Sequence, residues 1–327
     1  MTTPATAISP ASAAPNAPAY PSDPTLPGDP GPGRAWIAAT VAMALEADLG
    51  SVTRRDVTTQ ATISPSVRGT ADLVAREDGT VAGLGAVRET LTQVCEIFDL
   101  APVQVEHLVV DGERVRAGQV LAHLTGPVQA LLVAERTMLN IASRASGVAT
   151  AARAWTDVLD TVVRPDGSRA RVLDTRKTTP GLRALDKYAV RCGGGTNKRM
   201  GLYDVAMIKD NHVVAAGSVA AAVASGRERF PEVAVQVEAD TQAQAVEAVE
   251  AGADFLLLDN MDDDALRATG EAVRALEESR GRGELEATGN LSLERAARVA
   301  ATGVDYMSVG ALTHSAPILD LALDLRA

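Results

Sequence analysis

The hydrophobic and polar positions of this chain follow two different rhythms. From about residue 147 onward, short apolar segments alternate with alanine-rich helical ones. We expect strands at 171–174, 205–208, 233–237, 255–258, 285–287 and 306–309, with helices near 217–229, 241–251, 262–280 and 292–302. This alternation predicts a parallel sheet, open or closed into a barrel, with the helices outside it.

Residues 35–146 have a less regular pattern. A helix is expected at 35–48, strands at 70–76 and 103–110, and short strands with tight turns over 110–126. A long amphipathic helix is expected at 128–144. The pattern therefore predicts a first α/β domain over 35–146 and a barrel domain over 147–313.

Residues 1–34 form an Ala/Pro-rich tail that holds nine of the 16 prolines, and we expect it to be disordered. Elsewhere, hydrophobic residues make up 46% of the chain and aromatic residues 3%, so alanine, valine and leucine must fill the core. Two cysteines fit a reducing compartment, and the N-terminus lacks the order of a secretory signal. No apolar run reaches membrane-spanning length, so a cytoplasmic protein is expected.

The charge of the chain is unevenly distributed. A net charge of −11 argues against a broad nucleic-acid or anionic membrane surface. Residues 171–212 nevertheless hold nine Lys or Arg against four Asp or Glu, and they contain all four lysines of the chain. This stretch predicts an enzyme site for a small polyanionic substrate.

Polar residues follow the predicted strands, at the ends that face the active site in α/β barrels. In chain order they are cations, then carboxylates, then small turns: Arg176 and Lys177, Lys209, Glu238, Asp259, Thr288-Gly289-Asn290 and Gly310. A lysine here acts as an electrostatic clamp or a Schiff-base nucleophile, and the residues alone leave both open. The carboxylates suit ribose hydroxyls, Mg²⁺ or an oxocarbenium-like centre, and the turns suit a phosphate.

A stripe of Arg183, Lys187 and Arg191 recurs every four residues on an expected helix. Like charges at this spacing repel one another in an isolated helix. The stripe therefore needs either a bound anion or acidic partners within the protein, and the sequence favours neither.

Several segments together resemble the quinolinate phosphoribosyltransferase family, also called carboxylating nicotinate-nucleotide pyrophosphorylase. They are "ERTMLNIASRASGVAT", "DTRKTTPGLRALDKYAVRCGGGTNKRMGL", "IKDNH", "LLLDNM" and "VDYMSVGALTHSAPILDLALDL". The resemblance is strongest over 135–325 and extends more loosely to about residue 35.

The resemblance implies an N-terminal α/β sandwich, completed by about 314–327, joined to an open, incomplete TIM-like α/β barrel. It implies a homodimer with sites shared across the interface. The reaction of the family converts quinolinate and phosphoribosyl pyrophosphate, with Mg²⁺, to nicotinate mononucleotide, pyrophosphate and CO₂.

The family's site residues carry over by motif. The quinolinate side would comprise Thr175, Arg176, Lys177, Lys198, Arg199 and Lys209, with Arg136 supplied by the partner subunit. The ribose and metal would be held by Glu238 and Asp259, and the 5′-phosphate by Thr288, Gly289, Asn290, Val309, Gly310 and Ala311. Lys177, Lys209, Glu238 and Asp259 would be the catalytic groups. One departure concerns Lys198, which stands where the family usually has His.

Three other functions are considered. A paralogous phosphoribosyltransferase of the same fold would keep the phosphate residues and use a different acceptor. A Schiff-base aldolase would use Lys209 as its nucleophile. A binding protein without activity would not need a complete two-substrate site.

Overall fold

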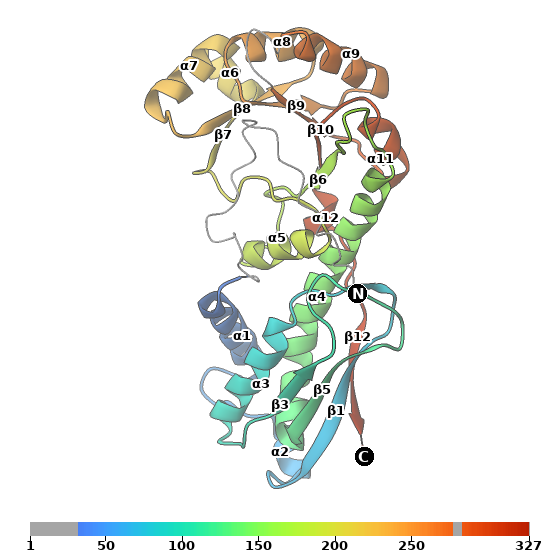
Figure 1. Ribbon diagram of the computed structural model, residues 1–327. Helices are drawn as coiled ribbons and strands as arrows, with labels where there is room; N and C mark the ends of the chain where they lie inside the picture. The colour runs from blue at the N-terminus through green and yellow to red at the C-terminus, as the bar shows by residue number, and fades with distance from the viewer. Residues whose placement is uncertain (1–31, 277–282, 327) are drawn as a thin grey trace, which may run out of the picture.

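The computed structural model describes residues 32–276 and 283–326, and the predicted tail over 1–34 lies almost entirely outside them. A four-stranded antiparallel sheet forms one layer of the N-terminal half (Figure 1). Its order is β12-β1-β5-β3, with β1 at Arg68–Ala75, β3 at Gln104–His107, β5 at Val120–Pro127 and β12 at Leu321–Arg326. The last strand of the chain therefore pairs with the first.

Helices cover one face of this sheet. They are α1 at Arg34–Leu49, α3 at Gly85–Ile97 and the first half of α4. Alternate residues of β1, Ala71, Leu73 and Ala75, are fully buried and join the apolar cluster that these helices share. The short helix α2, at Val57–Thr62, and the paired strands β2, at Gly79–Thr80, and β4, at Arg114–Val115, complete this half.

The helix α4, Val128–Asp160, connects the two halves and packs against both α3 and α5 (Arg183–Cys192). It has 33 residues, which corresponds to about 50 Å. A helix ending at residue 144 was predicted, but residues 145–149 are buried on every side and show no amphipathic contrast. Gly147 lets the returning chain cross this helix, because a Cβ there would lie 2.0 Å from the carbonyl oxygen of Pro317.

The C-terminal half is a six-stranded parallel sheet in the order β6-β11-β10-β9-β8-β7. The strands are β6 at Arg171–Leu173, β7 at Val205–Ile208, β8 at Ala234–Ala239, β9 at Phe255–Asp259, β10 at Glu284–Thr288 and β11 at Tyr306–Ser308. Among the described residues, no ladder joins β6 to β7, although Thr196 bridges to Leu173 of β6. The predicted open α/β barrel is confirmed.

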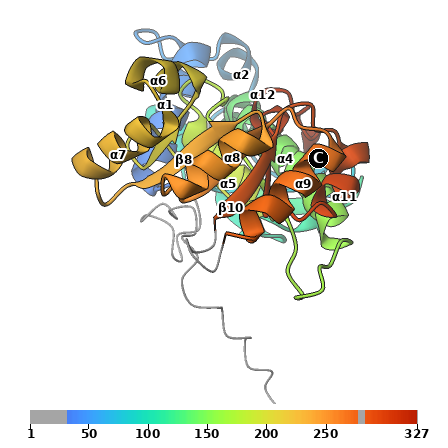
Figure 2. The same cartoon turned by 90° about the horizontal axis from the view of Figure 1, so that it is seen from above.

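Helices cover the outside of this barrel (Figure 2). They are α6 at Asp210–Ala216, α7 at Val219–Arg229, α8 at Gln242–Glu250, α9 at Asp263–Arg274 and α11 at Leu293–Ala300. The short helix α12, at Ala311–His314, instead packs against α4 and α5 (Figure 1). Small residues allow close packing: Ala245 and Ala248 of α8 are fully buried in the cluster that holds Leu256 and Leu258 of β9. The helix predicted over 262–280 corresponds to α9, and the last residues of the prediction lie outside the described residues. Within the described ranges, every helix is too short or too polar to cross a membrane.

Candidate active site

A cavity of about 590 Å³ opens at the carboxyl ends of the barrel strands. Five cationic and two acidic side chains line it, so its wall carries a net positive charge. The lining residues are Thr175, Arg176, Lys177, Lys198, Arg199, Met207, Lys209, Glu238, Leu257, Asp259, Asn260, Thr288, Gly289 and Ser308. Ten predicted residues thus meet at one place, although they lie up to 114 positions apart in the sequence.

The turn after β6 presents two of these cations. The Thr175 hydroxyl accepts a hydrogen bond from the Lys177 amide at 3.0 Å, which bends the chain away from the strand direction. Arg176 is half-buried, and its Nε is buried with no hydrogen-bond partner among the described residues. A buried guanidinium donor without a partner is costly, so this position favours an anionic ligand.

Lys209 and Glu238 form an ion pair across neighbouring strands. Ile208 lies opposite Val237 in the parallel register, which places the two following residues side by side. The Lys209 side chain is 46% exposed. An activated Schiff-base lysine is usually desolvated or beside another cation, and an exposed lysine paired with a carboxylate does not match that environment.

The next strand ends form a tight polar turn. Asp259 lies opposite Thr288 in the register of β9 and β10. Gly289 has φ +77°, and a Cβ there would lie 2.2 Å from the Asn260 Oδ1, so only glycine fits. Asn260 donates to Asp259 at 2.8 Å and accepts from Asn290 at 3.1 Å. Asn260 was not predicted as a site residue, although it directly follows Asp259 in the segment "LLLDNM".

The ammonium of Lys198 points into the barrel floor. It lies 2.5 Å from the Glu286 Oε1, and the Glu286 Oε2 accepts from Gln236 at 2.8 Å. The side chains of Lys198 and Glu286 are only 7% and 1% exposed. The charge expected to face a substrate carboxylate is therefore already compensated within the protein.

Two members of the cationic stripe on α5, Lys187 and Arg183, have partners within the protein. Lys187 is buried and pairs with Asp174, which also accepts from the Lys198 amide. Burial raises the pKa of Asp174 and lowers that of Lys187, and their mutual attraction opposes both shifts. Arg183 donates to the Thr178 hydroxyl and the Met200 carbonyl oxygen, each at 3.1 Å.

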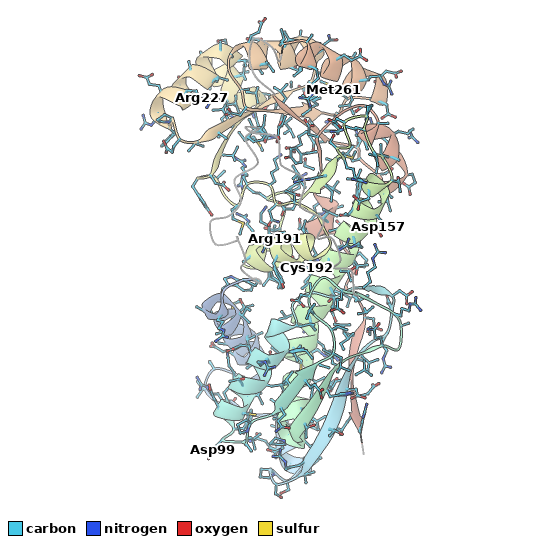
Figure 3. All side chains as sticks on the ribbon, in the orientation of Figure 1. Asp99, Asp157, Arg191, Cys192, Arg227 and Met261 are labelled. Atoms are coloured by element: carbon cyan, nitrogen blue, oxygen red, sulfur yellow. The ribbon has the colours of Figure 1, made fainter. Side chains whose placement is uncertain are left out.

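The last member of the stripe, Arg191, lies 5.7 Å from the ring centroid of Tyr188. Arg191 and Cys192 end α5 near the N-terminal half of the molecule (Figure 3). No residue of the stripe lines the cationic cavity. Of the two alternatives left open by the sequence, partners within the protein account for Lys187 and Arg183, whereas the Arg191 Nε is buried with no hydrogen-bond partner among the described residues.

Five predicted site residues do not line the cavity: Arg136, Asn290, Val309, Gly310 and Ala311. Arg136 is exposed on α4, and no hydrogen bond or ion pair joins it to another described residue. Gly310 lies beside the site, since a Cβ there would be 3.0 Å from the Lys177 Cδ.

A second cavity, of about 400 Å³, lies between α1, α3, α4 and α5. Trp36, Ile37, Ile141 and Leu185 make it mainly apolar, which does not suit a polyanion. Within residues 32–276 and 283–326, no three His, Cys, Asp or Glu side chains gather to form a metal site.

Two family models match successive parts of the chain. The quinolinate phosphoribosyl transferase N-terminal domain matches residues 56–146, and the C-terminal domain of the same family matches residues 148–324. The chain is 44% identical to the carboxylating nicotinate-nucleotide pyrophosphorylase of Mycobacterium leprae over 270 residues, 83% of this chain and 91% of that protein. It is 40% identical over 258 residues to the probable enzyme of that name from Bacillus subtilis, 78% of this chain and 83% of that protein.

Solved structures give the same result. The nicotinate-nucleotide pyrophosphorylase from Francisella tularensis superposes with a TM-score of 0.79 at 31% identity, covering 91% of this chain and 98% of that one. NadC from Streptococcus pyogenes superposes with a TM-score of 0.80 at 35% identity, covering 90% of this chain and 98% of that one. The chain therefore belongs to the quinolinate phosphoribosyltransferase family.

Proposed function

We propose that this protein is a decarboxylating quinolinate phosphoribosyltransferase, which converts quinolinate and phosphoribosyl pyrophosphate to nicotinate mononucleotide, pyrophosphate and CO₂ for NAD biosynthesis. The observation that carries the proposal is the cavity at the strand ends, in which five cations and two carboxylates converge. A dianionic acid and a polyphosphate both require such a cationic wall. Family membership supplies the identity of the two substrates.

Quinolinate would bind on the side of the cavity formed by Arg176, Lys177, Arg199 and Lys209. The unpartnered Arg176 Nε supports a carboxylate there, since a guanidinium binds a carboxylate through paired N–H groups. Thr175 would hold the turn that presents Arg176 and Lys177, as its bond to the Lys177 amide indicates.

The ribose would lie against Glu238 and Asp259, with its 5′-phosphate near the turn at Thr288, Gly289 and Asn290. The backbone at 309–311 would complete this binding site for the 5′-phosphate. Gly289 supports the assignment, because a backbone without a Cβ leaves its amides accessible to an anion.

The two carboxylates also fit Mg²⁺ bound together with the substrate. Mg²⁺ is usually held by one or two carboxylates plus substrate phosphates and water, rather than by a cage of protein ligands. Glu238 and Asp259 supply two carboxylates, and the absence of a larger acidic cluster in the described ranges agrees with this arrangement. When bound, the ion would neutralise the charge that develops on the departing pyrophosphate.

Catalysis would come from positioning and charge. The pyridine nitrogen forms a bond to the anomeric carbon as the bond to pyrophosphate breaks. The pyridinium then accepts the electron pair released as CO₂ leaves, and the ring carbon takes up a proton. Lys177 and Lys209 would orient the acceptor and stabilise the leaving charges, while Glu238 and Asp259 would stabilise the cationic sugar.

We further propose that the active protein is a homodimer, in which Arg136 enters the cavity of the partner subunit. The exposure of Arg136, and its lack of a bond to another described residue, support this role. We also propose a cytoplasmic location, which agrees with the two unbridged cysteines, Cys95 and Cys192.

The proposal is tested by incubating the purified protein with Mg²⁺, phosphoribosyl pyrophosphate and quinolinate labelled in the carboxyl group next to the ring nitrogen. Labelled CO₂ and nicotinate mononucleotide should form in equal amounts. Use of nicotinate in place of quinolinate, or no product from either, would overturn the assignment. Borohydride added with a carbonyl substrate should trap no covalent adduct at Lys209.

A further inference from the structure

Arg144 lies on α4 directly behind the turn that carries Arg176 and Lys177. It is not among the residues that line the cavity. Its guanidinium nevertheless bonds to Thr179, just after that turn, and to Thr313, which itself bonds to Lys177. The side chain is 19% exposed, so most of these bonds are shielded from water.

The first group of contacts lies after the turn. Arg144 Nε and one terminal nitrogen donate to the Asp186 Oδ1 at 3.3 and 3.2 Å. The same terminal nitrogen donates to the Thr179 hydroxyl at 3.2 Å, and the Asp186 Oδ2 accepts from the Thr179 amide at 2.9 Å. Arg144 and Asp186 together therefore fix the backbone and the side chain of Thr179.

The second group of contacts reaches Lys177 through α12. Arg144 donates to the carbonyl oxygen of Thr313, and the Thr313 hydroxyl donates to the Lys177 carbonyl oxygen at 2.8 Å. Arg144 also donates to the carbonyl oxygen of Ala316 at 3.4 Å. Thr313 is fully buried, so this connection has no competing water.

The Asp186 carboxylate depends on Arg144. Its side chain is 0% exposed, and Arg144 is its only ion-pair partner among the described residues. Burial raises the pKa of Asp186, whereas its bonds to the Thr179 amide and to Arg144 lower it. Removing the guanidinium would leave a buried charge whose remaining partners lie in the turn, and the turn would have to move.

We propose that Arg144 is a positioning residue for the reaction, which holds Lys177 in place through Thr313 and through the Asp186–Thr179 pair. This inference rests on the proposed function. It assigns a kinetic role to a residue that does not line the cavity. A displacement of about 1 Å at a catalytic group can lower the rate on the order of a hundredfold. Loss of the Arg144 contacts should therefore lower kcat.

The chain offers a matched control in Arg164. This arginine is 14% exposed, pairs with the buried Asp305 at 3.3 Å, and donates to the carbonyl oxygen of Val304. Its contacts resemble those of Arg144, although Asp305 also pairs with Arg274 at 2.6 Å. Asp305 immediately precedes β11, at the end of the barrel opposite the cavity. Loss of Arg164 should disturb the fold without displacing Lys177.

The experiment compares Arg144→Met and Arg164→Met with the full-length protein in quinolinate turnover and thermal unfolding. Both variants should lower Tm. Only Arg144→Met should lower kcat, by about tenfold or more, with KM for either substrate changed by less than about threefold. Arg144→Lys, which keeps a charge beside Asp186, should recover part of the loss.

Thr313→Val is a second variant that keeps the side-chain shape and removes only the hydroxyl, which donates to the carbonyl oxygen of Lys177 at 2.8 Å and lies 3.3 Å from that of Gly310. It should also lower kcat, even if Arg144→Met does not fold. Unchanged kcat in Thr313→Val, or equal loss of kcat in the Arg144 and Arg164 variants, would overturn the positioning role. Absence of turnover in the unmodified protein would instead refute the proposed function, so the two failures are distinguishable.

Discussion

The Lys198 ammonium and the Glu286 carboxylate lie 2.5 Å apart and are almost completely buried beneath the cavity. Breaking a buried pair from one side leaves an uncompensated charge, which costs about 3–5 kcal/mol. Lys198→Met should therefore lower the free energy of unfolding by about this amount in urea titrations. A residue that only contacted quinolinate would instead raise KM and leave stability unchanged.

Two further variants make that test specific. Glu286→Gln in the Lys198→Met chain should restore part of the lost stability, because the amide is neutral and remains beside Gln236. Lys177→Met should change the unfolding free energy by less than about 0.5 kcal/mol, since Lys177 is exposed. Equal stability of the Lys198 and Lys177 variants would show that the buried pair contributes little.

Variants at Arg136 and Lys209 should each lose activity alone and should restore activity when they are mixed. Alone, Arg136→Ala and Lys209→Ala should each lower activity on the order of a hundredfold or more without unfolding the protein. In a dimer that shares sites, mixing the two inactive variants creates one complete site per mixed dimer. Random exchange should restore about a quarter of the original activity. Activity that stays at the level of the separate variants would exclude a role for Arg136 across the interface.

Activity should require Mg²⁺, and the ion should bind well only together with phosphoribosyl pyrophosphate. The protein supplies two carboxylates, and Glu238 is already paired with Lys209. Calorimetry should therefore detect much weaker Mg²⁺ binding without the phosphorylated substrate. Chelation should abolish turnover, and added Mg²⁺ should restore it. Tight binding of Mg²⁺ to the protein alone would contradict this view.

The barrel strands and the residues after them could be predicted from the sequence. Each strand is a short apolar run between helices, and the first polar residue after it must lie at the carboxyl edge of the sheet. Lys209, Glu238 and Asp259 were found in this way. The course of α4 beyond residue 144 could not be found, because residues 145–149 are buried on every side and leave no polar face to reveal the helical period.

The orientation of the charged side chains also could not be predicted from the sequence. Nine cations fall within 171–212, and the sequence does not say which face the cavity and which are paired inside the protein. Lys198 pairs with Glu286, which lies 88 positions away on β10. This pair could not be predicted, because the sequence does not say which strands lie next to β10 in the sheet. The Asp174–Lys187 pair is only 13 positions apart, but it crosses from a strand end to a helix that no short-range rule connects.

A final prediction concerns the C-terminal strand. Asp72 of β1 accepts from Arg326 of β12 at 2.6 Å and lies 2.7 Å from the His123 Nδ1 of β5, so one carboxylate joins three strands. Burial alone would raise the pKa of Asp72, but the bonds and charges of His123 and Arg326 outweigh it and lower the pKa below its usual value.

A carboxylate whose pKa is lowered by folding stabilises the protein above its unfolded pKa, about 3.9, and this contribution is lost as the pH falls through the lower folded value. Asp72→Asn should cost about 1.5–3 kcal/mol at pH 7, and the difference in Tm from the unmodified protein should shrink below about pH 4. Asp324→Asn is the control, because its pair with Arg76 is nearly half exposed and should contribute little. A Tm difference for Asp72→Asn that stays constant from pH 7 to about pH 2.5 would mean that the charge of Asp72 does not hold β12 in the sheet.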